Sequence, residues 1–139
     1  MSRILPGDGP VEAASAALIC GDRILMVRRG REPARGMLAF PGGRLRPGET
    51  PEAAARREVI EETGLCPGAL APIRTFEPEE TGGRFRLHVF CGEIAGDPPI
   101  AGDDAEHAAW YRLDELAGLP VTSTSLELAR RLLERETQA

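Results

Sequence analysis

The sequence contains no lysine, so its 17 basic side chains are all arginines, against 22 acidic ones and a formal net charge of −5. It also lacks any run of 18 apolar residues, which excludes a membrane-spanning helix. The mild acidity argues against a protein that coats nucleic acid, since its surface would be basic. A chain without lysine can bind an anion only through arginine, backbone N–H groups or metal ions.

Neither a signal peptide nor a disulfide framework is expected. Pro6 and Gly7 interrupt the N-terminal segment too early for a signal sequence. The three cysteines are odd in number and lack the spacing of zinc ligands, so we expect them to be small buried apolar residues. Length and composition fit a single domain spanning residues 1–139, which we expect to be cytoplasmic.

Charge is distributed unevenly along the chain. Between Arg23 and Arg57, nine arginines accompany three acids, so this segment carries +6 and the remainder −11. A solvated, arginine-rich surface would account for many of these side chains. However, the arginines lie in a Gly/Pro-rich stretch that leads into a glutamate cluster. Cations beside tight turns and acidic clusters are typical of phosphate and metal chemistry.

Short apolar runs separated by turn residues predict a mixed α/β domain. The first two runs predict a hairpin around Gly21-Asp22, and the third strand is expected to end at Pro41-Gly42-Gly43. A loop is expected over 30–36. Strands are predicted at residues 14–20, 23–29, 37–40, 69–76, 85–92 and 108–113.

Two helices are predicted. The first spans 51–63, with Thr50 as its N-cap and Gly64 able to take the left-handed conformation after its last residue. The second is C-terminal and is expected to begin with a capping box between Thr124 and Glu127, followed by leucine and alanine at helical spacing.

The predicted helix over 51–63 concentrates acidic side chains on one face. At 100° per residue, Glu58, Glu61 and Glu62 fall within an arc of about 100°. Neighbouring like charges on a helix repel by roughly a few tenths of a kcal/mol per pair, and Arg57 offers compensation at i,i+4 only to Glu61. Divalent cations would stabilise such a face. Carboxylates without histidine or cysteine favour Mg²⁺ or Mn²⁺ over zinc.

The spacing of these residues resembles the Nudix box, G-x5-E-x7-R-E-U-x-E-E-x-G-U, where U is a bulky aliphatic residue. The match begins at Gly43, continues at Glu49 and ends with residues 57–65, without a mismatch. One departure from related nucleotide-diphosphate hydrolases is Met37, whose position is often tryptophan, and this leaves the substrate open. Similarity to those hydrolases extends to residues 28–30, 35–36, 40–43 and 109–116.

The resemblance implies the Nudix fold, an α/β/α sandwich around a mixed sheet. It also implies hydrolysis of a nucleoside diphosphate linked to another moiety, by attack of water at a phosphorus. Glu58 and Glu62 would be the main ligands of Mg²⁺ or Mn²⁺, with Glu61 a further ligand or the general base. Glu49 and the backbone carbonyl of Gly43 would support the metal site.

Other roles implied by the resemblance concern residues around the metal site. Arg57 would hold the glutamates in place through charge-assisted hydrogen bonds. The general base stays open between Glu61 and an acid of a later loop. The loop candidates are Asp103, Asp104 and Glu106. The candidate contacts to substrate phosphates or ribose are Arg28, Arg29 and Arg35.

The arginine- and glycine-containing lead-in most resembles ADP-ribose pyrophosphatases. ADP-ribose or a related nucleotide sugar is therefore the first expectation, with AMP and a sugar phosphate as products. An oxidised (d)NTP pyrophosphatase that releases pyrophosphate is the closest alternative, and a dinucleoside polyphosphate or capped-RNA hydrolase stays open. We expect a small-molecule nucleotide diphosphate as partner, no membrane and no stable nucleic-acid partner, with a homodimer left open.

A non-catalytic Nudix-fold nucleotide sensor is the alternative from another functional class. Such modules usually lose glutamates of the box and often carry an additional DNA-binding domain. Here all four box glutamates are present, and within 139 residues we expect no winged helix in addition to a Nudix-like domain. The sequence therefore favours an enzyme.

Overall fold

The computed structural model describes residues 9–102 and 105–138. The chain first forms a hairpin of β1 (Val11–Cys20) and β2 (Arg23–Arg29). Gly21 takes φ +60° in the turn between them, a conformation that glycine adopts without steric cost. The predicted hairpin is confirmed, and β1 begins earlier than expected.

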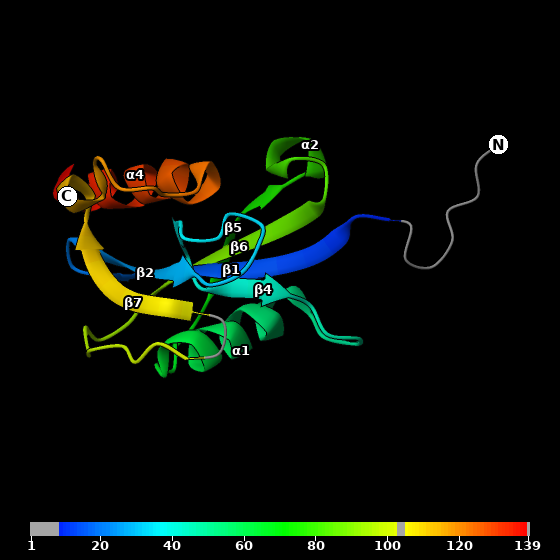
Figure 1. The fold of residues 1–139 in the computed structure, drawn as a ribbon. Coiled ribbons are helices and arrows are strands. Elements are labelled where there is room, and N and C mark those ends of the chain that lie inside the picture. The colour runs from blue at the N-terminus through cyan, green and yellow to red at the C-terminus, as the bar shows by residue number, and fades with distance from the viewer. Residues whose placement is uncertain (1–8, 103–104, 139) are drawn as a thin grey trace.

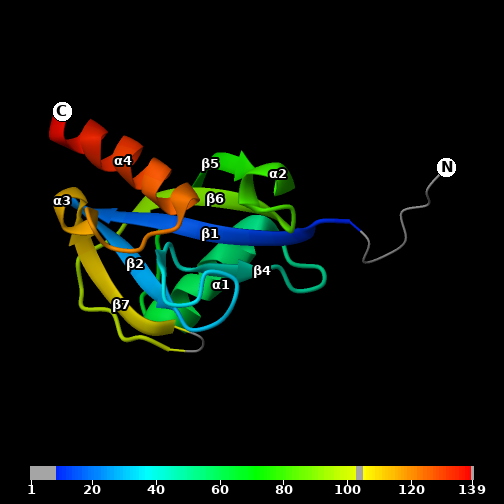
Figure 2. The same cartoon turned by 45° about the horizontal axis from the view of Figure 1, so that its top comes forward.

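In the described part of the chain, seven strands form one mixed sheet with the order β3-β2-β1-β6-β5, with β4 paired to β1 and β7 paired to β2. Figure 2 shows β7, β2, β1, β6 and β5 side by side. β6 runs parallel to β1, and the other pairs are antiparallel. The remaining strands are β3 (Leu38–Ala39), β4 (Gly42–Arg44), β5 (Ala71–Phe76), β6 (Phe85–Glu93) and β7 (Ala105–Arg112).

The strands of the hairpin diverge away from their turn. Near the turn they pair through Ile19↔Ile24 and the adjoining pair. Farther along, β1 takes β4 as its antiparallel neighbour, with Ala14 opposite Gly43, while β2 pairs with β3 and β7. The short strands β3 and β4 therefore lie between two arms of the sheet.

The third predicted strand is confirmed as β3, which ends before Pro41-Gly42-Gly43 as expected, but Gly42 and Gly43 begin a further strand, β4, that was not predicted from the sequence. A Cβ atom on Gly42 would lie 2.5 Å from both the carbonyl oxygen of Ala14 and the Cβ of Ser15. Glycine is therefore required by close packing against β1 at this position, rather than by a turn.

Two long helices cover opposite faces of the sheet, α1 (Pro51–Thr63) and α4 (Ser123–Gln138) (Figure 1). Alternate residues of β1 point to opposite faces of the sheet. Ala16 packs in the core beneath α1, and Ala17 packs in the core beneath α4. This arrangement is the predicted α/β/α sandwich. Two one-turn helices, α2 (Pro78–Thr81) and α3 (Leu113–Leu116), were not predicted.

The ends of α1 agree with the prediction. The Thr50 hydroxyl accepts a hydrogen bond from the Ala53 N–H at 3.2 Å, and Gly64 has φ +73°. The capping box expected at the start of α4 is wrong, since the helix already begins at Ser123 and the Glu127 carboxylate accepts from Arg74 at 3.1 Å. Glu127 thus ties the helix to β5.

The cysteine expectation is wrong in part. Cys66 is exposed, and Cys20 and Cys91 are half-buried, all with free thiols. Across residues 9–102 and 105–138, no helix is long and apolar enough to cross a membrane.

Candidate active site

The site forms where β4 passes the buried face of α1. Glu58 and Glu62, one helical turn apart, both point into this contact and are 9% and 7% exposed. The Gly42 N–H donates to Glu62 Oε2 at 3.3 Å. A Cβ atom on Gly43 would lie 2.7 Å from both Cδ and Oε1 of Glu58, so only glycine leaves room for this carboxylate.

Arg57 connects the other carboxylates of the box. Its Nε and Nη2 donate to the two oxygens of Glu49, at 2.7 and 2.9 Å. Its Nη1 donates to Glu58 Oε1 at 2.6 Å and to Glu61 Oε2 at 3.2 Å, and Nη2 also donates to the Arg44 carbonyl at 3.1 Å. One largely buried guanidinium therefore holds three carboxylates and the end of β4 together.

The carboxylates have contrasting protonation behaviour. The bidentate hydrogen bonds from Arg57 lower the pKa of Glu49 to about 2, and Glu49 in turn raises the pKa of Arg57. Burial, followed by the charge of Glu58, raises the pKa of Glu62 well above its ordinary value, against the opposing effects of the Gly42 N–H and Arg29. Glu62 therefore lies where a negative charge is costly unless a cation neutralises it.

The residues present fit a hard divalent cation in charge, burial and donor type. The donors of the box are carboxylate and backbone oxygens, the ligands that Mg²⁺ and Mn²⁺ prefer. The absence of a side chain at Gly43 lets the Glu58 carboxylate lie directly against the backbone of β4. Among the residues that the structure describes, no three carboxylate, imidazole or thiol groups already converge as a metal site. The fit thus lies in the chemistry of the donors rather than in a preformed cage.

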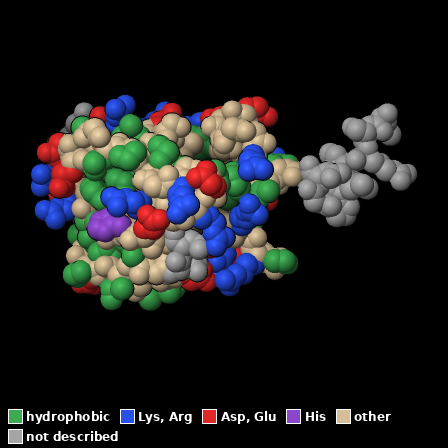
Figure 3. All heavy atoms as spheres, in the orientation of Figure 1, with side chains coloured by type: hydrophobic (Ala, Val, Ile, Leu, Met, Phe, Trp, Pro, Cys, Tyr) green, Lys and Arg blue, Asp and Glu red, His purple; other side chains and the backbone are tan. Residues whose placement is uncertain are grey.

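A cleft of about 930 Å³ opens over these carboxylates, between the diverging arms of the sheet. Glu58, Glu61 and Glu62 are among its lining residues, and Phe40 and Leu87 contribute apolar surface. Figure 3 shows arginine side chains, in blue, gathered over the right-hand part of one face, with acidic side chains among them. The arginines that line the cleft are Arg28, Arg29, Arg31, Arg44, Arg46 and Arg57.

The predicted substrate contacts have different locations. Arg28 and Arg29 line the cleft, and Arg29 Nε also donates to the Pro33 carbonyl at 2.6 Å, which fastens the 30–36 loop. Arg35 belongs to that loop, is exposed and lies outside the lining. Met37 also lines the cleft.

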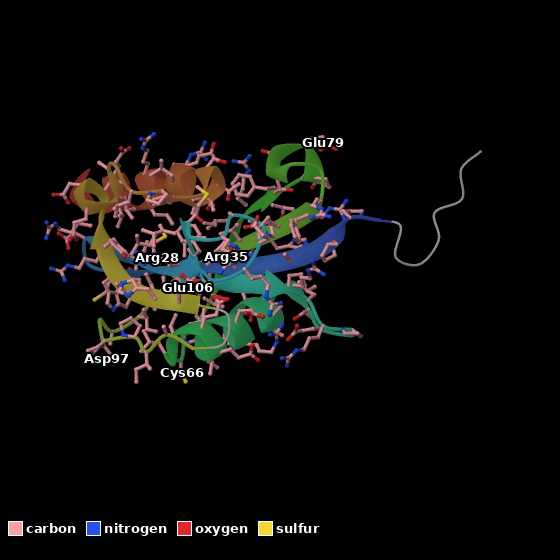
Figure 4. The ribbon with its side chains drawn as sticks, in the orientation of Figure 1. Arg28, Arg35, Cys66, Glu79, Asp97 and Glu106 are labelled. Carbon is pink, nitrogen blue, oxygen red and sulfur yellow. The ribbon has the colours of Figure 1, made fainter. Side chains whose placement is uncertain are left out.

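The predicted acidic residues outside α1 also differ in their position relative to the cleft. Glu49 is held by Arg57 and is not among the residues that line the cleft. Glu106 is exposed on β7, beside the β2 strand that carries Arg28, and is not part of the lining (Figure 4). The other two loop candidates, Asp103 and Asp104, lie outside the described residues.

Sequence reasoning did not single out several residues that line the cleft. Arg44 and Arg46 were counted only within the basic segment, although their position inside the box could have identified them. Phe85 and the hydroxyl residues at the start of α4 come from distant parts of the chain. The local sequence gives no signal for their arrival here. These hydroxyl residues are Ser123, Thr124 and Ser125.

Comparisons with known proteins agree with this geometry. Residues 10–133 match the family model described as NUDIX domain. An ADP-ribose pyrophosphatase of Methanocaldococcus jannaschii is 34% identical over 112 residues, 79% of this chain and 66% of that protein. The mouse (Mus musculus) 8-oxo-dGDP phosphatase NUDT18 is 34% identical over 94 residues, 65% of this chain and 28% of that protein.

Among solved structures, a similar one is a bifunctional NMN adenylyltransferase/ADP ribose pyrophosphatase of Francisella tularensis, complexed with AMP and a manganese ion. It has a TM-score of 0.75 and 26% identity, covering 92% of this chain and 42% of that one. This chain therefore spans less than two thirds of the length of each of these three proteins.

Proposed function

Since this chain belongs to the NUDIX family, we propose that it hydrolyses the pyrophosphate bond of a nucleoside diphosphate linked to another moiety, with Mg²⁺ or Mn²⁺ as cofactor. ADP-ribose or a related nucleotide sugar is the first substrate, giving AMP and a sugar phosphate. The observation that carries the proposal is the buried Glu58 and Glu62 pair, seated against two glycines beneath an arginine-lined cleft.

In this proposal the residues of the box have distinct roles in metal binding and proton transfer. Glu58 and Glu62 hold the metal, with Glu49, Glu61 and the Gly43 carbonyl in support. A bound divalent cation neutralises phosphate charge and lowers the pKa of bound water. Glu61, which lines the cleft, is a further metal ligand or the general base that takes a proton from the attacking water, and the loop acids are the alternative base.

The arginines orient the acids and bind the anion. Arg57 is a positioning residue, because its guanidinium fixes Glu49, Glu58 and Glu61 through hydrogen bonds within the network. Arg28 and Arg29 bind phosphate oxygens from the cleft wall, and guanidinium groups suit such contacts. Arg35 is a further candidate from the adjoining loop. Water adds to one phosphorus, the bridging P–O bond breaks, and the two halves leave as phosphate monoesters.

The substrate choice is supported by the names of relatives and by the cleft. ADP-ribose agrees with the Methanocaldococcus jannaschii and Francisella tularensis proteins. A second candidate, an oxidised nucleotide, is favoured by the mouse relative and by Met37, whose flexible side chain lines the cleft where a base or sugar would pack. The two candidates differ in product, because an oxidised (d)NTP would release pyrophosphate.

The test is a panel of nucleotides with Mg²⁺, including ADP-ribose, ADP-glucose and 8-oxo-dGTP, with products separated by ion-exchange chromatography. We expect AMP and ribose 5-phosphate from ADP-ribose, loss of turnover with EDTA and its return with Mg²⁺ or Mn²⁺. The matched inactive control is Glu62→Gln, which keeps the volume and removes a charge that binds metal. We expect turnover about a thousandfold lower in this variant.

Three results would contradict the proposal. Turnover unaffected by EDTA, or near-normal turnover in Glu62→Gln, would remove the metal assignment. Binding of ADP-ribose in the presence of Mg²⁺ without hydrolysis of any compound in the panel would instead indicate a nucleotide sensor.

A further inference from the structure

Arg46 lies in the turn between β4 and α1 and contacts two glutamates of the box. Its backbone N–H donates to Glu49 Oε1 at 2.8 Å, whereas its guanidinium Nη2 donates to Glu61 Oε1 at 3.1 Å. The second oxygen of Glu61 accepts from Arg57 Nη1 at 3.2 Å. Both oxygens of this carboxylate therefore lie next to a guanidinium.

The two arginines on Glu61 differ in how firmly they are held. The Arg57 side chain is 16% exposed and donates to three carboxylates and a backbone carbonyl. The Arg46 side chain is 63% exposed, and its pair with Glu61 is the one hydrogen bond of its guanidinium within the described residues. Exposed single ion pairs contribute little to stability, so Arg46 can leave Glu61 easily while Arg57 cannot.

We infer that Arg46 is a displaceable counter-cation of Glu61 that competes with the divalent metal for this carboxylate. The inference rests on the proposed function in one respect, namely that a divalent cation binds at the box. Without metal, Arg46 neutralises the most exposed of the three α1 carboxylates that line the cleft. A doubly charged ion beside Glu61 repels this guanidinium, so metal binding and the Arg46–Glu61 pair exclude each other.

This role is separable from a structural one. The turn is anchored by the backbone N–H of Arg46 on Glu49, and by the Glu49 N–H on the Arg46 carbonyl at 3.0 Å. Replacing the side chain leaves both bonds in place. Arg46→Met keeps an unbranched side chain and removes the charge alone.

The test is direct Mn²⁺ binding to the purified full chain without substrate, measured from the electron paramagnetic resonance signal of free Mn²⁺. The matched control is Arg44→Met, which removes one positive charge from the same cleft. The Arg44 guanidinium lies over the Phe85 ring, 5.8 Å from its centroid. We expect Arg46→Met to tighten Mn²⁺ binding roughly three- to tenfold at low salt, and Arg44→Met less than about twofold.

A double-mutant cycle identifies Glu61 as the shared group. In a Glu61→Gln background the carboxylate is absent, so adding Arg46→Met should change the Mn²⁺ affinity by less than about twofold. An equal gain with and without Glu61 would overturn the inference, as would equal affinities of Arg46→Met and Arg44→Met. Failure of the wild type to bind Mn²⁺ would also overturn it.

The Mn²⁺-binding measurements test this inference without any measurement of turnover. Competition for Mn²⁺ without hydrolysis of any nucleotide would contradict the proposed function and support this inference. Metal-dependent hydrolysis with identical Mn²⁺ affinities in the two arginine variants would support the proposed function and contradict this inference.

Discussion

The two long helices cover opposite faces of one sheet but bury different kinds of side chain (Figure 1). Within the described residues, α4 buries leucine and alanine together with a single hydroxyl, that of Ser125. The buried face of α1 instead includes Glu58 and Glu62 in the same layer as Val59. An ordinary supporting helix follows the α4 pattern, since buried charge is costly without a partner.

The two helices therefore differ in role: α4 mainly stabilises the fold, and α1 carries the groups of the candidate site. α1 approaches β1 closely through small side chains, Ala54 and Ala55, which leaves its glutamates packed against the glycines of β4. The Gly42 N–H and Arg57 offset part of the cost of their burial. α4 contributes apolar contacts that compensate elsewhere, as is common for proteins that hold strained or charged groups in functional sites.

The largest effect that separates the helices is a gain of stability on removing an α1 carboxylate. Because the pKa of Glu62 is raised, the folded metal-free protein keeps a proton that the unfolded chain releases near pH 4.5. Above that pH the unfolding free energy falls as pH rises, by up to about 1.4 kcal/mol per unit, until Glu62 ionises. Glu62→Gln abolishes this contribution, so the variant should be the more stable protein at pH 7 in EDTA.

Urea unfolding of both proteins from pH 5 to 8 measures this difference. The exposed Glu79 on α2 supplies the control, since Glu79→Gln changes the same group away from the core (Figure 4). A stability difference between wild type and Glu62→Gln that stays constant across this range would contradict the role given to burial.

The converse effect is expected for α4. Leu128 is 3% exposed in the core beneath this helix. Leu128→Ala should lower the unfolding free energy by about 2–4 kcal/mol, while turnover below the melting temperature stays near the wild-type value. Arg130→Ala, exposed on the same helix, should change stability by less than about 0.5 kcal/mol. A Leu128→Ala enzyme that is stable but inactive would contradict the conclusion that α4 contributes to stability rather than to chemistry.

A smaller effect on turnover is expected at Gly43, whose missing side chain leaves room for the Glu58 carboxylate. Gly43→Ala would bring Cβ within 2.7 Å of Glu58 Cδ, so the carboxylate must move. We expect turnover to fall roughly tenfold to a hundredfold, because small displacements of site groups are costly. Gly68→Ala is the control, as a Cβ there meets nothing within 4 Å. Equal turnover in the two variants would show that Glu58 tolerates displacement.

Sequence reasoning succeeded where the signal is local. The α1 helix could be predicted in full because Thr50, Pro51 and Gly64 mark its ends within a short stretch. The spacing of the box glutamates also fixes which of them share a helical face. Burial of Glu58 and Glu62 could not be read from that spacing, since it depends on how closely β4 approaches.

The errors arose where distant contacts override local preference. The β3 strand ends before Pro41-Gly42-Gly43 as predicted, but β4, which forms because Gly42 and Gly43 pair with β1, has no local signal. Thr124 and Glu127 have the spacing of a capping box, but the Glu127 carboxylate finds Arg74, far away in sequence. The four-residue helices α2 and α3 are too short for a periodic pattern to be detected.

The smallest expected effect tests whether charge also holds α4 in place. The Arg74–Glu127 pair links this helix to β5, with its side chains 29% and 45% exposed. Arg74 keeps its ion pair with Glu80 and its position 4.2 Å from the Phe76 ring centroid when Glu127 is neutralised. Glu127→Gln should therefore cost less than about 0.5 kcal/mol, and high salt should reduce that cost further. Urea unfolding at low and high salt measures both. A loss comparable to that of Leu128→Ala would mean that α4 is held as much by charge as by its apolar face, and the contrast with α1 would no longer hold.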